Sequence, residues 1–144
     1  MDLGILTVTI AAIVAIITFG QWQSARMKLR YELFEKRYGV YEKITGFLAS
    51  VAITGRVEAG AEVTLLQETK RAHFLFSGDA GIKQLISRIY GNAVDLWALQ
   101  AELENLNGDS RSQNIQRQRE IKDALESELH SAEGQFEKYL LLKE

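Results

Sequence analysis

The sequence predicts an all-α protein in which an N-terminal transmembrane helix continues into a long amphipathic helix, packed in an antiparallel bundle. Three observations predict it. No charged residue lies between Asp2 and Arg26, apolar residues elsewhere recur mainly at steps of three and four, and proline is absent. Apolar residues at such steps line one face of a helix, and a chain without proline permits long unbroken helices. We therefore expect three long helices, one short helix and no strands.

The apolar run at the start of the chain predicts a membrane anchor. The stretch from Leu3 to Trp22 has 20 residues, and as a helix it is about 30 Å long, which matches the hydrocarbon core of a bilayer. A secretory signal peptide is the main alternative, but it needs a basic start, whereas this chain starts with Met-Asp, and the run is too long. A buried soluble helix is disfavoured because the run is apolar on every side.

Charge asymmetry around the span predicts its orientation. No Lys or Arg precedes the span, and several follow it closely: Arg26, Lys28, Arg30, Lys36 and Arg37. By the positive-inside rule, the N-terminus is expected outside and the bulk of the chain in the cytoplasm. We therefore divide the chain into an anchor, residues 1–22, and a cytoplasmic helical bundle, residues 23–144. The predicted membrane-interface residues are Trp22, Arg26, Lys28 and Arg30.

Caps and turns predict the helix boundaries. Gly55 can end the first helix, Thr64 and Gln67 have the spacing of a capping box, Asp79 can cap a helix, and residues 107–110 form a turn. Residues 55–63 are expected to be a loop. The expected helices are Leu3 to about Thr54, about 64–76, about 80–106 and about 112–143.

The apolar faces of the long helices are the predicted core. On the first helix this face comprises Met27, Tyr31, Phe34, Tyr38, Tyr41, Thr45, Leu48 and Ala52, widened by Leu33, Val40, Ile44, Phe47 and Val51. On the third it comprises Ile82, Leu85, Ile86, Ile89, Ala93, Leu96, Trp97, Leu103 and Leu106. On the last it comprises Ile115, Ile121, Leu125, Leu129, Ala132, Phe136, Tyr139 and Leu140.

Residues 33–41, LFEKRYGVY, carry a resemblance to a known group of proteins. With Phe47-Leu48 further on, they resemble a motif of small, mostly uncharacterised bacterial single-pass membrane-anchored helical proteins, LF-[DE]-KR-aromatic-x-VY after the transmembrane helix. Residues 71–76 (RAHFLF) and 89–93 (IYGNA) are similar in kind to later elements of these proteins. The resemblance implies the same architecture and a bacterial inner membrane, and it implies no catalytic or ligand-binding residue.

The sequence predicts no catalytic, cofactor-binding or metal-binding residues. Cysteine is absent, which excludes disulfides, thiolate catalysis and zinc–sulfur sites. Phosphate-binding, nucleophile-elbow and zinc-protease motifs are also missing. Glu126, His130 and Glu133 have helical spacing for a metal site, but the Glu-x-x-His repeats of di-iron bundles are not present, which favours an exposed Glu126–His130 pair.

A second basic cluster consists of Arg111, Arg117, Arg119 and Lys122. Solvated charges at a helix start are the favoured interpretation, with contact to the bilayer as an alternative if the preceding turn faces the membrane. Nucleic acid is not expected as a partner, because no aromatic platform accompanies the cluster and Glu120 and Asp123 interrupt it.

Aromatic and basic residues alternate after the span, and we call them the aromatic–basic motif: Phe34, Lys36, Arg37, Tyr38 and Tyr41. This motif has two interpretations. In the first, the aromatic rings pack between helices and Arg37 pairs with a carboxylate such as Glu102 or Glu104. In the second, they form a recognition surface for a partner protein.

The sequence thus predicts a non-enzymatic membrane-anchored protein. We expect its bundle to self-associate or to dock an unidentified protein partner, with the lipid bilayer as its other contact and no cofactor or small-molecule substrate. The alternative is a small, toxin-like effector that perturbs the bilayer when it oligomerises, because the threonines and alanines of the span permit contacts between helices in lipid.

Overall fold

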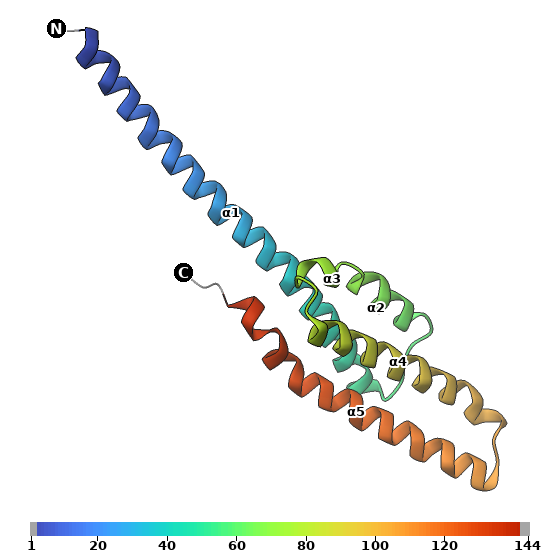
Figure 1. Cartoon of the computed structure of the whole chain (residues 1–144). Helices are drawn as coiled ribbons and strands as arrows, with labels where there is room; N and C mark the ends of the chain where they lie inside the picture. Colours follow the sequence, from blue (N-terminus) through green and yellow to red (C-terminus); the bar gives the residue numbers. More distant parts are fainter. Residues whose placement is uncertain (1–2, 142–144) are drawn as a thin grey trace. The chain divides into compact units, whose positions relative to one another are not determined.

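The computed structural model describes residues 3–141, and the described residues contain helices but no strand, so the predicted all-α class is confirmed (Figure 1). The helices are α1 (Leu3–Thr54), α2 (Ala61–Thr69), α3 (Ala72–Leu75), α4 (Ala80–Glu102), the 3₁₀ helix η1 (Leu103–Asn105) and α5 (Gly108–Leu140). The described residues up to Glu35 form one unit, and those from Lys36 onward form a second, packed unit. Residues 23–35, which follow the predicted anchor, are helical and exposed except for the half-buried Phe34.

The first unit consists of the first part of α1, whose described residues up to Trp22 form an apolar stretch. This helix is long and apolar enough to cross a membrane, and no other described helix is. Thr7, Thr9 and Thr18 donate hydrogen bonds to carbonyl oxygens four residues earlier, at 2.8–2.9 Å. Their hydroxyl groups are therefore satisfied within the helix, as a membrane interior requires.

In the second unit, one face of α1 is buried from Val40 onward. Val40, Ile44, Leu48 and Val51 are at most 5% exposed and follow steps of four, four and three, as helix geometry requires for one face. The predicted face was too broad: it contained these four buried residues, but it also contained Tyr38, which is 45% exposed. The apolar residues of α1 are more numerous than those that α2–α5 cover, so periodicity alone did not select the buried ones.

The loop after α1 is shorter than predicted. Gly55 has φ +66° and its N–H donates to the carbonyl of Val51 at 2.8 Å, so the expected glycine cap is confirmed. The prediction of a capping box at Thr64 and Gln67 is wrong. Helix α2 begins earlier, at Ala61, so Thr64 lies inside the helix, where its hydroxyl donates to the carbonyl of Gly60 at 3.1 Å. Gly60 has φ +81°, and this left-handed conformation starts the helix a turn early.

Helices α4 and α5 lie side by side as an antiparallel pair (Figure 1). Asp79 caps α4 as predicted, because its Oδ1 accepts from the backbone N–H groups of Gly81 at 2.7 Å and Ile82 at 3.4 Å. Helix α4 ends at Glu102 and α5 begins at Gly108, both earlier than predicted. The predicted end of the last helix, near residue 143, lies outside the described residues.

Two polar side chains of α5 are buried among the helices. Asn114 and Gln118 are 5% and 6% exposed, whereas the predicted inward residue Ile115 is 43% exposed. The Asn114 amide donates to the carbonyl of Leu99 at 3.0 Å, and the Gln118 amide donates to Asn114 Oδ1 at 2.7 Å. The Asn114 amide thus bonds a backbone carbonyl in the last turn of α4 and links that turn to α5.

Candidate functional site

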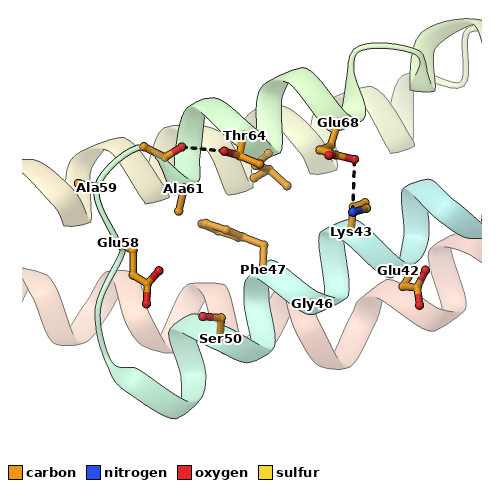
Figure 2. Close-up of a pocket in the computed structure, with 12 residues that line it drawn as sticks. Glu42, Lys43, Gly46, Phe47, Ser50, Glu58, Ala59, Ala61, Thr64 and Glu68 are labelled. Atoms are coloured by element: carbon orange, nitrogen blue, oxygen red, sulfur yellow. Dashed lines mark hydrogen bonds and ion pairs between the residues drawn. The ribbon is translucent and has the colours of Figure 1, made fainter.

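A groove of about 790 Å³ lies between α1 and α2, and we call it the α1–α2 groove (Figure 2). It is lined by Glu42, Lys43, Gly46, Phe47, Ser50, Glu58, Ala59, Gly60, Ala61, Thr64, Leu65 and Glu68. All belong to the packed unit. The groove is therefore bounded by two helices and the loop that connects them.

Helical spacing places these residues along the groove. On α1, Glu42, Gly46 and Ser50 are four residues apart and so lie on one side of the helix. The residues of α2 that line the groove follow the same rule, from Ala61 to Glu68. Small residues keep the space open: a Cβ atom added to Gly46 would meet no other atom within 4 Å.

The floor of the groove is apolar. Phe47 is half-buried and Leu65 is 4% exposed. Figure 2 shows the Phe47 ring in the space between the helices, directed toward Ala61. Of these two side chains only Phe47 is open to a ligand, and an apolar side chain exposed in a groove is typical of a site that binds by burying apolar surface.

The rim of the groove is acidic. Glu42, Glu58 and Glu68 line it together with a single cation, Lys43, which leaves two negative charges in excess (three minus one). Lys43 Nζ lies 3.5 Å from a carboxylate oxygen of Glu68 (Figure 2), and the two side chains are 54% and 41% exposed. Such an exposed pair contributes little to stability, so both groups are able to exchange partners.

The lining combines hydroxyl groups and carboxylates with apolar side chains. Hydroxyl groups of Ser50 and Thr64 lie on the groove, but the described lining contains no histidine, cysteine or arginine. The arrangement therefore offers apolar surface and negative charge to a ligand.

The predicted aromatic–basic motif is divided between the two units. Phe34 belongs to the first unit, whereas Lys36, Arg37, Tyr38 and Tyr41 belong to the second. Arg37 Nε donates to the carbonyl of Leu75 at 2.9 Å, and its guanidinium carbon lies 5.3 Å from the centre of the Tyr139 ring. The predicted pairing of Arg37 with Glu102 or Glu104 is therefore wrong: the carbonyl that ends α3 is its partner.

The aromatic residues of the motif differ in burial. The half-buried Tyr41 ring packs edge-on against Phe136, with 5.5 Å between ring centres, and Tyr38 lies 5.9 Å from Tyr41. Lys36 is exposed. In this unit the motif thus packs α1 against α3 and α5 through Arg37 and Tyr41, while Tyr38 and Lys36 are accessible to solvent.

A charged cluster ties the start of α4 to the end of α5. Lys138 Nζ lies 2.6 Å from Asp79 Oδ2, and the Tyr139 hydroxyl donates to the same oxygen at 2.5 Å. The Lys138 ammonium, then the Tyr139 hydroxyl and the backbone N–H of Gly81, hold the pKa of Asp79 well below its usual range. The hydrogen bond to Asp79 in turn raises the pKa of Lys138 and of Tyr139. The predicted cap is thus also a link between helices, which its sequence position does not reveal.

The histidines do not join a metal site in the described residues. No group of three His, Asp or Glu side chains there is close enough to hold a metal ion. His130 Nδ1 lies 2.8 Å from the backbone carbonyl of Glu126, so the two residues form an exposed pair through that carbonyl. His73 is exposed and packs edge-on against Phe74.

The second basic cluster is only partly brought together. At 3.6 residues per turn, Arg111, Arg119 and Lys122 share one side of α5, whereas Arg117 lies on another side. Arg111 donates to the carbonyl of Leu103 at 2.6 Å, at the end of the packed unit remote from Asp79 and Tyr139.

At the predicted membrane interface, the guanidinium carbon of Arg26 lies 4.1 Å from the centre of the Trp22 ring, while Lys28 and Arg30 are exposed.

The chain matches no protein-family model, no curated protein and no solved structure.

The α1–α2 groove was not predicted from the sequence. The one sequence pattern that could have indicated it is a row of small or acidic residues, Glu42, Gly46 and Ser50, spaced four apart beside the apolar face. Such a row is common on any solvated side of a helix, so it does not single out a groove.

Proposed function

We propose that this protein is a non-enzymatic, single-pass protein of the bacterial inner membrane that holds another protein at the cytoplasmic face. The observation that carries the proposal is the α1–α2 groove, with the half-buried Phe47 on its floor and an acidic rim, in a chain whose helix α1 is long and apolar enough to span a membrane. Accessible apolar surface of this kind is typical of interaction sites.

The orientation and the setting rest on the sequence. Arg26, Lys28 and Arg30 closely follow the apolar stretch, which favours a cytoplasmic packed unit. The resemblance of residues 33–41 to small bacterial membrane-anchored proteins supports the bacterial inner membrane.

Site-specific crosslinking in cells tests the proposal. The chain has no cysteine, so Ser50→Cys places a single reactive group in the groove, and Ser127→Cys places one on the exposed surface of α5. We expect both variants in the membrane fraction, and we expect a distinct second protein to be crosslinked from position 50 but not from position 127. A chain that is recovered in the soluble fraction, or that crosslinks only to copies of itself, contradicts the proposal.

A second candidate function is favoured by one observation in the first unit. Thr7, Ala11, Ala15 and Thr18 line a shallow hollow along α1, and small residues allow transmembrane helices to approach closely. A bilayer-perturbing effector would assemble through this face. Loss of membrane potential on expression, abolished by Ile13→Arg, supports this candidate, and an unchanged potential removes it.

A further inference from the structure

We propose that the α1–α2 groove takes a short, basic, amphipathic helix of another protein. This inference rests on the proposed function and specifies the partner's chemistry. An apolar stripe on that helix would cover the half-buried Phe47, and Lys or Arg side chains beside the stripe would meet Glu42, Glu58 and Glu68.

Because the walls of the groove are helices, we expect side chains and not backbone groups to recognise the ligand. Both walls are helices, whose backbone groups already bond within each helix. An extended peptide gains affinity by adding to an exposed sheet edge, which the described residues do not provide, whereas an amphipathic helix binds a groove through its side chains. From Glu42 to Ser50 the groove follows α1 for about 12 Å, which corresponds to two or three helical turns of ligand.

The negative charges on the rim favour a positively charged ligand. The lining carries two negative charges in excess, and its one cation is already beside Glu68. A two-fold dimer that set one groove against the same groove of a second copy would bring like charges together, which disfavours it. A basic ligand instead gains attraction and exchanges the weak Lys43–Glu68 pair for its own contacts.

The basic side of α5 in a second copy is the competing occupant. It presents Arg111, Arg119 and Lys122 with the half-exposed Ile115. The Lys122 ammonium lies close to Gly55, however, nine residues beyond the middle of the groove at Gly46. Lys122 is half-buried there, and Arg111 already donates to the carbonyl of Leu103 at 2.6 Å, so two of the three cations are engaged within their own chain. A different protein meets no such constraint.

Peptide binding to the full-length chain in phosphatidylcholine nanodiscs tests the inference. The probe is a fluorescent Leu/Lys peptide of about 14 residues, or four helical turns, with a Leu/Glu peptide of equal length as the matched control. Binding is the anisotropy change above that of nanodiscs without protein. We expect the Leu/Lys peptide to bind at least about tenfold more tightly than the Leu/Glu peptide, and less tightly as salt is raised.

Two glycine substitutions locate the bound peptide. Gly46→Leu fills the groove, and Gly91→Leu adds the same side chain to α4, outside the groove. A Cβ at either position meets no atom within 4 Å, and leucine favours helix more than glycine does, so both variants are expected to fold. Gly46→Leu should weaken peptide binding at least about tenfold and Gly91→Leu by less than about twofold.

Three results would overturn the inference: equal binding of the two peptides, unchanged binding to Gly46→Leu, or a wild-type oligomer that Gly46→Leu dissociates. The last would make a second copy the occupant. This test is independent of crosslinking in cells. If the peptide fails to bind while position 50 still captures a second protein, the basic-helix inference fails and the proposed function stands.

Discussion

Helix α1 has large apolar side chains along both of its halves, but their surroundings differ. Before Lys36 these side chains point in every direction and, apart from the half-buried Phe34, are exposed, as at Val8 (70%) and Ile16 (72%). After Lys36 those on one side are buried, as at Ile44 (0%) and Leu48 (1%). An all-round apolar helix needs an apolar solvent, whereas a one-sided one needs other helices. The comparison teaches that one continuous helix can be stabilised by two different environments.

The largest expected effect is in the packed half. Phe136 is fully buried and contacts the rings of Tyr41 and Phe76. Phe136→Ala should lower the free energy of unfolding by about 3–5 kcal/mol, because it removes buried surface and leaves a cavity. Phe19→Ala is the matched control, since Phe19 is 63% exposed. Circular dichroism during denaturant unfolding should separate the two, and an equal loss of stability would break the comparison.

The apolar half should be sensitive to charge. Ile13→Arg is expected to disfavour membrane insertion by about 3–4 kcal/mol, because arginine at the centre of a span is costly and isoleucine is favourable. Ile53→Arg makes the same change in the packed half, at a side chain that is 84% exposed. Membrane fractionation should move only Ile13→Arg toward the soluble fraction. Retention of that variant in the membrane would show that residues 3–22 do not form the anchor.

The buried amides of α5 sharpen the comparison. Thr hydroxyls in the apolar half bond their own helix, whereas Asn114 bonds Leu99 of α4 and Gln118 of α5. Asn114→Ala should cost about 1–3 kcal/mol, since a buried carbonyl and amide lose a partner. The exposed neighbour Gln113 provides the control. Thermal unfolding should show a clear loss for Asn114→Ala alone; equal stability of both variants would contradict this role of the amide.

The smallest effect concerns pH. The pKa of Asp79 is lowered in the folded chain, first by Lys138, so its contribution to stability is present above the unfolded value of about 3.9 and is lost as pH falls below it. Asp79→Asn keeps a capping residue but not this charge. Between about pH 5 and about pH 3, the melting temperature should fall more in the wild type than in this variant. The side chain of Lys138 is 64% exposed, so salt should weaken the difference.

The exposed Asp95 of α4 serves as the control for that experiment. Asp95→Asn should retain the wild-type pH dependence. If Asp79→Asn retains it as well, acid loss of stability arises from another carboxylate.

Local signals predicted the helices well because they act over a few residues. The apolar run, Gly55 and Asp79 each specify a helix or its end without reference to distant parts of the chain. Errors arose where two local signals competed. Thr64 and Gln67 suggested a helix start, but the left-handed Gly60 began α2 earlier, and the apolar Ile115 was chosen for the core over its neighbour Asn114.

The sequence by itself determined the all-α class, the apolar helix at the start of the chain and the glycine and aspartate that bound two helices, because each follows from the conformations and solvation of neighbouring residues. Only the tertiary structure decided which apolar side of α1 is buried, that Arg37 bonds Leu75, that Asp79 meets Lys138 and Tyr139, and that small and acidic residues border a groove. These contacts join residues tens of positions apart, or align the sides of separate helices. Their geometry is set by how helices pack, which no local pattern encodes.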